Sequence, residues 1–187
     1  MENTNKTALL VMDLQNPIIQ SIENPAKIVN NVSTAVAHAR VKKIPIIYVV
    51  VGFRPGVPEI SEQNKSFSQL NNKSMWTPEF SAQWEQIHSD LTPQSGEVII
   101  TKRRISAFTG SDLEVVLRAQ GIRHLILTGI STSGVVLSTI REAADKDFQL
   151  TVIEDCCADR DAEVHKILTA KVFPAQAEVI NLSTWLV

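Results

Sequence analysis

The chain has 187 residues, 44% of them hydrophobic and 20% charged, which is enough apolar material to fill the core of one domain. Twenty acidic and eighteen basic residues leave a formal net charge of −2, so the composition gives no support to binding of nucleic acid or an anionic membrane. The longest apolar runs fall far short of the roughly 20 residues that a membrane span needs. We therefore expect a protein with no nucleic-acid partner and no membrane segment.

Short β-branched runs alternate along the chain with stretches of helical periodicity, a pattern typical of a parallel sheet covered by helices on both faces. The predicted strands are Ala8–Met12, Ile44–Val51, Val98–Thr101, His124–Thr128, Leu150–Ile153 and Glu178–Asn181. The predicted helices are Pro25–Val41, Ser111–Gln120, Gly134–Lys146 and Asp161–Val172. This order predicts an α/β fold with three α/β/α layers and a mostly parallel six-stranded sheet, in a single domain over residues 1–187.

The helix over Ser111–Gln120 carries the clearest local signals. Ser111 and Glu114 form a Ser-x-x-Glu capping box, and Gly121 stands where a helix stop belongs.

The segment from Gly52 to Gly96 breaks the alternation because it is rich in Pro, Asn, Ser and Gln. A connection of this length is unusual in a compact domain, so we expect a short helix around Glu79–His88 and a role as a lid or subunit contact, with a plain surface excursion as the alternative. Its apolar residues Trp76, Phe80 and Trp84 are candidate anchors for a partner subunit, and packing within the chain is the other interpretation.

The familiar cofactor motifs are missing from the sequence. The seven glycines form neither G-x-G-x-x-G nor G-x-x-x-x-G-K-[ST], so no cofactor is expected. The four histidines, His38, His88, His124 and His165, show no metal-ligand spacing, so no metal site is expected. Ser131 and Ser133 could be nucleophiles by position, but no histidine is placed in sequence to activate them, and turn or capping roles are preferred.

Polar groups follow the ends of three predicted strands. Asp13 closes the first, Lys102 the third, and Gly129 the fourth. Ligands of doubly wound sheets bind at the carboxyl ends of the strands. An acid, an ammonium group and a turn of backbone N–H donors therefore could meet in one crevice and polarise a small polar substrate, although each residue also has an ordinary capping, surface or packing interpretation.

Four segments carry a resemblance to a known family. They are Ala8–Asn16 with an Asp-x-Gln element; Lys102 with Ser106-Ala107-Phe108 and Gly110–Leu113; Leu125–Thr132 with Val136, Thr139, Arg141 and Ala143; and Asp155–Ala158. In order and spacing they resemble the isochorismatase-like hydrolases, also called the cysteine hydrolase superfamily.

The resemblance implies an Asp-Lys-Cys site that hydrolyses an amide or imide bond or, in isochorismatases proper, a vinyl ether. Asp13 and Lys102 match the first two positions, and Val135 stands at the position of the nucleophilic cysteine. A valine has no nucleophilic atom, so a covalent thioester at this position is excluded.

Three alternatives follow from Val135. In the preferred one, Asp13 acts as general acid or base without a covalent intermediate. In the second, the chain is a catalytically silent ligand-binding or regulatory protein. In the third, Cys157 or Cys156, expected just past the fifth strand, supplies a thiol from elsewhere in the chain. Cysteines in such a turn are more often buried packing residues.

The resemblance also implies backbone donors and substrate contacts. The donors are expected from Ile130, Ser131, Gly134 and Val135, with a cis peptide between Ile130 and Ser131. The expected substrate-binding residues are Gln15, Phe108 and Arg54, whose guanidinium could clamp a carboxylate or could simply lie at the surface. The metal-binding residues of the nicotinamidase branch are not found.

Family members usually assemble, so a homodimer or higher homo-oligomer is expected. The residues Met1 to Thr7 are polar and show no secretory signal core, and the adjacent Cys156 and Cys157 rarely reach disulfide geometry. Both observations favour a cytoplasmic location. The identity of the substrate does not follow from the sequence.

Overall fold

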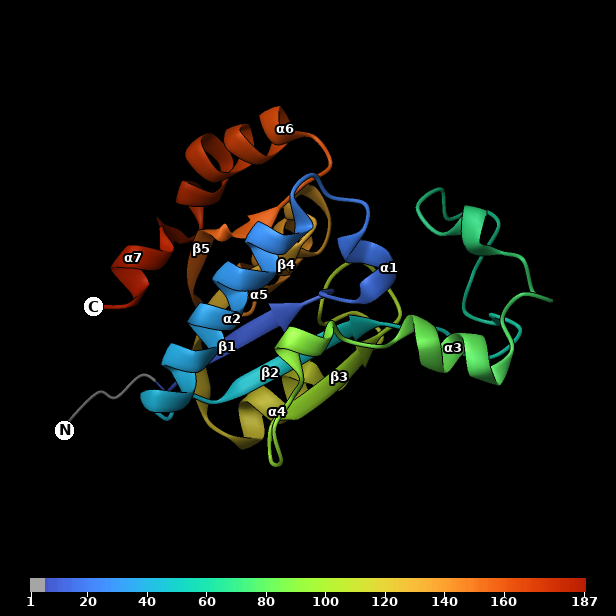
Figure 1. Ribbon diagram of the computed structural model, residues 1–187, viewed down its shortest axis with the longest axis horizontal. Coiled ribbons are helices and arrows are strands. Elements are labelled where there is room, and N and C mark those ends of the chain that lie inside the picture. The colour runs from blue at the N-terminus through green and yellow to red at the C-terminus, as the bar shows by residue number, and fades with distance from the viewer. Residues whose placement is uncertain (1–5) are drawn as a thin grey trace.

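A computed structural model describes residues 6–187, and most of the polar leading segment lies outside them (Figure 1). Six strands form one parallel sheet, as predicted. Their bounds are β1 Lys6–Met12, β2 Ile46–Val51, β3 Val98–Lys102, β4 Ile122–Ile130, β5 Gln149–Ala158 and β6 Glu178–Ile180. β2 consists entirely of buried β-branched residues and one tyrosine, because in a sheet covered on both faces each side of a central strand meets apolar side chains.

The strand order is β3-β2-β1-β4-β5-β6, so the chain moves outward in one direction from β1 and in the other from β4. Met12 pairs with Gly129 at the carboxyl ends of these two strands. A Cβ added to Gly129 would lie 2.2 Å from the carbonyl oxygen of Met12, which explains why only glycine fits here. The loops after β1 and β4 diverge at this point and leave room for a ligand between them.

Helices cover both faces of the sheet (Figure 1). Their bounds are α1 Asn16–Ile19, α2 Pro25–Val41, α3 Pro78–Trp84, α4 Leu113–Ala119, α5 Leu137–Asp145, α6 Ala162–Ile167 and α7 Leu182–Trp185. α2 and α7 pack on one face, and α4 and α5 on the other. α2 has the predicted bounds, while α5 and α6 are shorter than predicted because one π-helical turn precedes α5 over Thr132–Val136 and another follows α6 over Leu168–Val172.

The predicted capping box is wrong. Asp112 is the residue before α4, and its side chain accepts no capping hydrogen bond. The hydroxyl of Ser111 donates to the carbonyl oxygens of Ala107 and Phe108, and the carboxylate of Glu114 binds Lys146 at 2.7 Å. Ser111 Oγ still accepts from the N–H of Leu113 at 3.3 Å, so it satisfies one donor at the start of α4. The ion pair takes Glu114, so the reciprocal half of the capping box is missing.

The end of the fifth strand was also misplaced. β5 continues past Ile153 to Ala158, through a register shift that leaves Cys157 paired with Gly129. Cys156 and Cys157 therefore lie inside the strand and not after it. The polar pair Glu154-Asp155 concealed this continuation, because polar residues interrupt the apolar run from which the strand was predicted.

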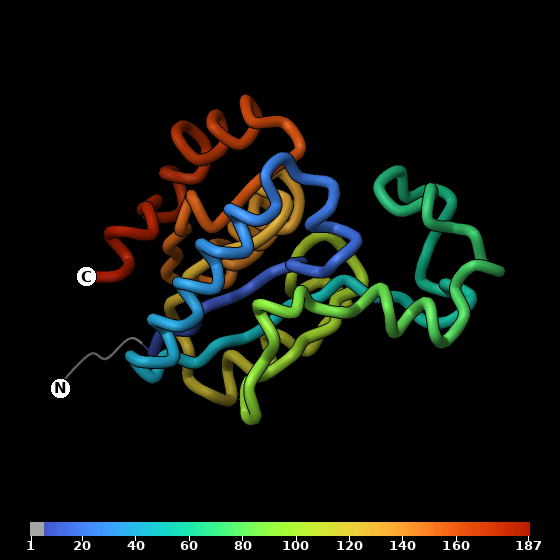
Figure 2. Tube along the Cα trace, viewed as in Figure 1, coloured from blue at the N-terminus to red at the C-terminus, as the bar shows by residue number. Residues whose placement is uncertain are grey.

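The long segment between β2 and β3 forms a lobe, which we define as residues 53–84. Figure 2 shows the lobe standing beside the carboxyl ends of β1 and β2, with α3 leading the chain back toward the sheet. The predicted short helix around Glu79–His88 is present as α3, but it ends earlier, at Trp84. The side chain of Thr77 caps its start by accepting from the N–H of Phe80 at 3.2 Å.

Candidate active site

Asp13 follows β1 directly and has a left-handed backbone with φ of 56°. Its N–H still donates to the carbonyl oxygen of Val49 at 2.8 Å, so the last bond of the β1–β2 ladder fixes the residue at the strand end. Lys102 ends β3, two strands away. Its side chain crosses the end of β2 to reach Asp13, and the Nζ–Oδ2 distance is 2.9 Å.

The Asp13–Lys102 pair is buried, with 6% of Asp13 and 1% of Lys102 exposed. Lys102 Nζ also donates to the carbonyl oxygen of Arg104 at 2.9 Å. The second carboxylate oxygen of Asp13, Oδ1, is inaccessible and has no hydrogen-bond partner among the described residues. A buried acceptor without a donor is costly, and in a site it marks the atom that a substrate or water would engage.

Burial raises the pKa of Asp13 from 3.8 to about 6, although the charge and hydrogen bond of Lys102 lower it. Desolvation thus outweighs the attraction of the ammonium group. At pH 7 a carboxyl group with this pKa is protonated in about one molecule in ten. Asp13 can therefore serve as a proton donor or as a proton acceptor close to neutral pH.

The turn after β4 provides the other side of the site. The peptide bond between Ile130 and Ser131 is cis, the geometry that the resemblance implies. The N–H groups of Gly134 and Val136 both donate to the carbonyl oxygen of Ser131, at 3.1 and 3.2 Å. Gly134 was expected to offer its N–H to a substrate, but this bond already occupies it.

These groups line one cavity of about 470 Å³. One wall comes from the strand ends and their turns and contains Asp13, Lys102, Ile130, Ser131, Ser133, Gly134, Val135, Asp159 and Arg160. Most of the remaining lining comes from the lobe and the segment after β1. It includes the apolar residues Phe53, Phe67, Leu70, Trp84 and Ile18 and the polar residues Ser21, Ser66 and Gln69. The charged groups of the cavity therefore come from the strand ends and their turns, and the lobe adds uncharged side chains, several of them aromatic.

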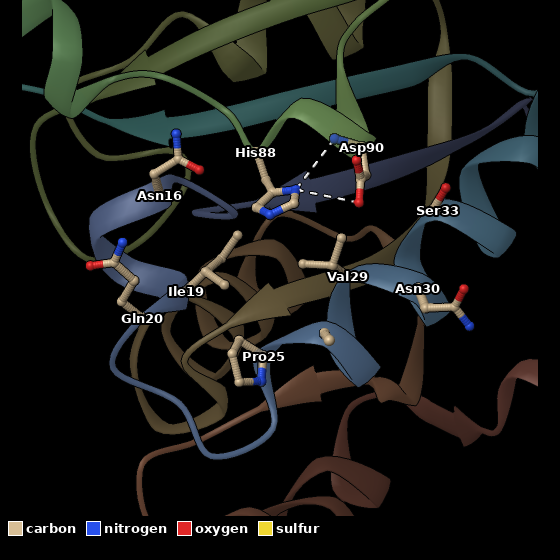
Figure 3. A pocket seen from close by; sticks show the side chains of 10 residues that line it. Asn16, Ile19, Gln20, Pro25, Val29, Asn30, Ser33, His88 and Asp90 are labelled. Atoms are coloured by element: carbon tan, nitrogen blue, oxygen red, sulfur yellow. Dashed lines mark hydrogen bonds and ion pairs between the residues drawn. The ribbon is translucent and has the colours of Figure 1, made fainter.

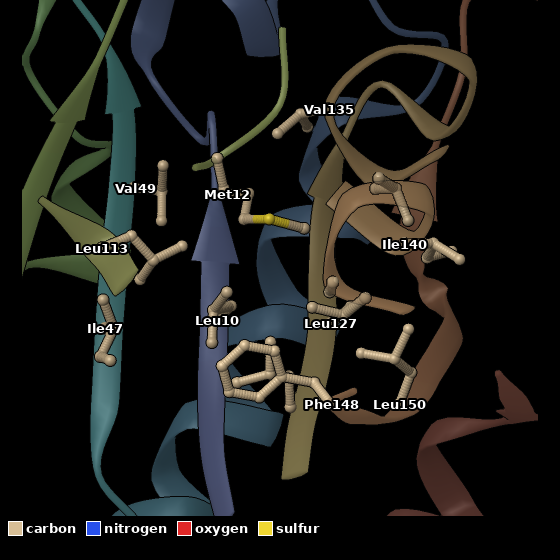
Figure 4. Close-up of a cluster of buried hydrophobic side chains, with 14 of the residues drawn as sticks. Leu10, Met12, Ile47, Val49, Leu113, Leu127, Val135, Ile140, Phe148 and Leu150 are labelled. Carbon is tan, nitrogen blue, oxygen red and sulfur yellow. The ribbon is translucent and has the colours of Figure 1, made fainter. Parts of the chain in front are cut away.

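Val135 is 2% exposed and packs against the top of the core between the sheet and α5. Figure 4 shows it beside Met12, at the end of a column of apolar side chains that runs along β1. A hydrocarbon side chain therefore meets the cavity where the resemblance would place a thiol. Neither Ser131 nor Ser133 has a hydroxyl hydrogen bond to a histidine in the part of the chain that is described.

Cys157 does not line the Asp13 cavity. Its side chain is buried, its Sγ lies 3.9 Å from the carbonyl oxygen of Leu127, and burial raises its pKa to about 12. Burial likewise raises the pKa of Cys156. A thiol that stays protonated at neutral pH is a poor nucleophile, so the structure gives no support to a displaced thiol.

The three expected substrate-binding side chains lie outside the cavity. Gln15 is fully buried, and its amide donates to the carbonyl oxygens of Val51 and Trp84 and accepts from the N–H of Val51. Arg54 is largely exposed and pairs with Glu59. Phe108 is a core residue that packs against a second phenylalanine behind the sheet.

Gln15 fastens the lobe, since its hydrogen bonds join Val51, two residues before the lobe, to Trp84, the last residue of α3. Arg103 makes a second fastening, with its guanidinium 3.8 Å from Glu59 and 3.7 Å from Glu85. Glu85 lies directly on Gly52, where any Cβ would overlap its carboxylate. The two ends of the lobe are therefore held together beside Lys102.

Asp159 and Arg160 line the cavity but are not predicted site residues, because β5 extends past its predicted end at Ile153 and so brings them to the edge of the sheet. Asp159 accepts a hydrogen bond from the N–H of Ser133 at 2.7 Å and so braces the turn after β4. Arg160 is exposed at the rim and forms no ion pair with the described residues. Their position directly after the Asp-x-Cys-Ala segment was the available signal.

A larger cavity of about 710 Å³ lies away from this site, between α1, α2 and residues 88–90. Figure 3 shows its lining, in which His88 and Asp90 face each other with an Nδ1–Oδ2 distance of 4.0 Å. It contains neither a buried charge pair nor a turn of backbone donors, so we place the candidate site at Asp13.

Two absences concern residues 6–187 as a whole. No group of three His, Cys, Asp or Glu side chains is arranged to hold a metal ion there. In the same range no helix has the length and apolar character to cross a membrane.

The model of the isochorismatase domain matches residues 7–184 of the chain. The chain is 32% identical over 169 residues to the uncharacterized isochorismatase family protein YwoC of Bacillus subtilis, which covers 90% of this chain and 86% of that protein. It is 30% identical over 200 residues to the ureidoacrylate amidohydrolase RutB of Pseudomonas syringae, and the alignment covers 96% of this chain and 78% of that protein. The structure of an isochorismatase family protein of Burkholderia thailandensis superposes with a TM-score of 0.84 at 25% identity, and the superposition covers 98% of this chain and 96% of that one.

Proposed function

Because the chain belongs to the isochorismatase family, whose members are hydrolases, we propose that it hydrolyses a small polar metabolite by a non-covalent route in which Asp13 transfers the proton. One observation carries this proposal. The cavity presents a buried carboxyl group with a pKa of about 6 and an unpartnered oxygen, next to Val135 and not next to a thiol.

A vinyl ether is the bond that this geometry serves best among the amide, imide and vinyl ether bonds of the family. Its cleavage needs no nucleophilic side chain, because the difficult step is protonation of the alkene carbon. Asp13 gives its proton to that carbon, and the oxocarbenium ion that forms adds water and collapses to an alcohol and a ketone. The water supplies its oxygen to the ketone and one hydrogen to the alcohol. Its other hydrogen returns to Asp13, which replaces the proton that the carboxyl group gave to carbon.

Lys102 supports this step from behind the carboxyl group. When Asp13 has lost its proton, the ammonium group 2.9 Å away pairs with the new carboxylate. The carboxylate in turn stabilises the positive charge of the oxocarbenium ion in a site of low dielectric. Amide or imide hydrolysis would use the deprotonated form of Asp13 to activate water, and it would proceed without the thioester that assists such reactions.

The test is a panel of isochorismate, simple amides and cyclic imides with wild type and two variants. Asp13→Asn removes the proton donor and is expected to lower turnover by about a hundredfold or more. Asp112→Asn makes the same chemical change at an exposed residue outside the cavity, whose side chain forms no capping hydrogen bond, and is expected to keep most of the activity. The rate of vinyl ether cleavage should fall as the pH rises through about 6, because the protonated form of Asp13 is lost.

Reaction in D₂O gives an independent signature. Protonation at carbon leaves one deuterium in the new methyl group of the product, which mass spectrometry detects. Equal activity of wild type and Asp13→Asn, or a methyl group without deuterium, would reject Asp13 as general acid.

The second candidate is a ligand-binding protein without turnover, and the valine at the nucleophile position favours it. Val135→Cys distinguishes the two, because it returns a thiol to a cavity that already holds Asp13 and Lys102. If the wild-type chain is silent but the pocket is otherwise intact, this variant should gain amide hydrolysis and react with iodoacetamide. A wild type that turns over no member of the panel yet binds its ligands would establish the binding role.

A further inference from the structure

The turn after β4, residues 131–136, forms part of the cavity lining, and two side chains from a later part of the chain hold it. The N–H of Ser133 donates to Asp159, and the hydroxyl of Thr132 is hydrogen-bonded to His165 with an Oγ1–Nδ1 distance of 2.8 Å. Thr132 is fully buried, and His165 is half-buried on α6. The position of the turn therefore depends on α6, although no residue of that helix lines the cavity.

The turn has few hydrogen bonds of its own. Its residues Thr132–Val136 form a π-helical turn, which is wider than an α-helical turn and rare in proteins. The N–H groups of Gly134 and Val136 share a single acceptor, the carbonyl oxygen of Ser131. The bond to His165 is the one hydrogen bond that the Thr132 hydroxyl makes within the described residues.

His165 is itself held in place on α6. The side chain of Asp161 caps the start of this helix by accepting from the N–H groups of Glu163 and Val164, at 2.9 and 3.3 Å. The hydroxyl of Thr169 donates to the carbonyl oxygen of His165 at 3.0 Å. The helix is thus fixed on both sides of His165, so its imidazole can act as a rigid support for the turn.

We propose that His165 is a positioning residue, which acts through Thr132 to hold the turn after β4 at the distance from Asp13 that the reaction requires. This inference deepens the proposed function and rests on it, because it takes the Asp13 cavity as the site of reaction. Ser133 and Val135 line that cavity, so a movement of the turn moves the surface on which a substrate lies. Proton transfer needs close approach, and a displacement of about 1 Å can lower the rate by about a hundredfold.

His124 provides a matched control away from the site. It is also half-buried, and its ring is hydrogen-bonded to Thr7 at 3.2 Å and to Thr151 at 2.9 Å. These three residues lie toward the amino ends of their strands and outside the cavity. Replacement of each histidine by leucine therefore removes an imidazole–hydroxyl bond, and only His165→Leu removes one that reaches the turn.

The first measurement is amide hydrogen exchange of the turn, followed by NMR, and it requires no enzymatic activity. His165→Leu should speed exchange of the N–H groups of Gly134 and Val136 by about fivefold or more, while His124→Leu leaves both unchanged. His165→Asn should restore slow exchange, because its amide places a polar atom near the position of Nδ1. Unchanged exchange in His165→Leu, or an equal increase in His124→Leu, would overturn the inference.

Thr132→Val removes the same hydrogen bond from the other side and keeps the shape of the side chain. Its effect on exchange should equal that of His165→Leu, and the double variant should show no further increase, because both changes remove one interaction. Additive effects would reject this bond as the support of the turn. Thr132→Val also decides the question if His165→Leu does not fold.

The second measurement is the kinetics of a substrate from the panel. His165→Leu should lower kcat by about tenfold or more and change KM by less than about threefold, because the reacting groups remain present but are misplaced. His165→Asn should recover most of kcat, and His124→Leu should keep it. A raised KM with unchanged kcat would reject the positioning role. If the wild type turns over no member of the panel, the hydrolytic proposal fails, and the exchange data still decide whether His165 holds the turn.

Discussion

The protonation of Asp13 should be visible in the stability of the protein, and Asp13→Asn isolates it. The wild-type carboxyl group has a pKa of about 6 when folded and 3.8 as its reference value, whereas asparagine does not titrate. Between these two pH values the folded state holds a proton that the unfolded state has released. The free energy of unfolding of the wild type therefore falls as the pH rises through this window.

The magnitude follows from the shift in pKa. A rise from 3.8 to about 6 is about two pH units, and each unit corresponds to 1.36 kcal/mol, so the whole effect is about 3 kcal/mol. The wild-type minus variant difference in unfolding free energy should decrease by about 2 kcal/mol from pH 4 to pH 6.5, with the rest of the effect below pH 4, and then level off.

Urea unfolding of both proteins at half-unit pH steps, followed by tryptophan emission, measures this difference. The urea dependence of the unfolding free energy should be the same for the two proteins, which shows that their denatured states are comparable. A difference that stays constant or increases with pH would mean that the attraction of Lys102 outweighs desolvation. Asp13 would then be an ordinary ionised carboxylate at neutral pH, and the argument for a general acid would fail.

Three further outcomes follow from the structure. Gly129→Ala should lower the unfolding free energy by about 3 kcal/mol or more, because the new Cβ would overlap the carbonyl oxygen of Met12. Gly96→Ala, at a position with positive φ but open space, should lower it by about 1 kcal/mol in the same urea titration. Cys157 should resist iodoacetamide in the native protein and react in urea, as read by mass spectrometry, and rapid native labelling would contradict its burial. Arg103→Ala should speed hydrogen exchange in the lobe about fivefold without changing β1, and unchanged exchange would show that the ion pairs do not fasten it.

Features that depend on local pattern could be predicted from the sequence. α2 has the predicted bounds because Pro25 begins it and apolar residues continue at helical spacing up to Val41. The meeting of Asp13 and Lys102 could also be expected, since both residues end parallel strands and such ends share one edge of the sheet. In these cases a short segment and the symmetry of the sheet contain the information that is needed.

Features that depend on contacts between distant segments could not be predicted. Gln15 looked like a ligand-binding residue because it lies beside Asp13, yet its amide satisfies backbone groups at Val51 and Trp84. The aromatic side chains of the lobe have no regular spacing that would reveal their contacts, because the rings meet only when the lobe folds back on itself. The continuation of β5 was hidden for a similar reason, since Glu154 and Asp155 are polar but lie in a strand.

The narrow attachment of the lobe has a consequence for how such a protein changes over evolutionary time. Residues 53–84 leave and rejoin the sheet at neighbouring points, and their rings support one another. The segment could be replaced as one block while Asp13 and Lys102 at the strand ends stay as they are. Relatives that share the same strands can thus diversify in the molecules they admit, and grafting another lobe onto this sheet is a direct route to a new preference.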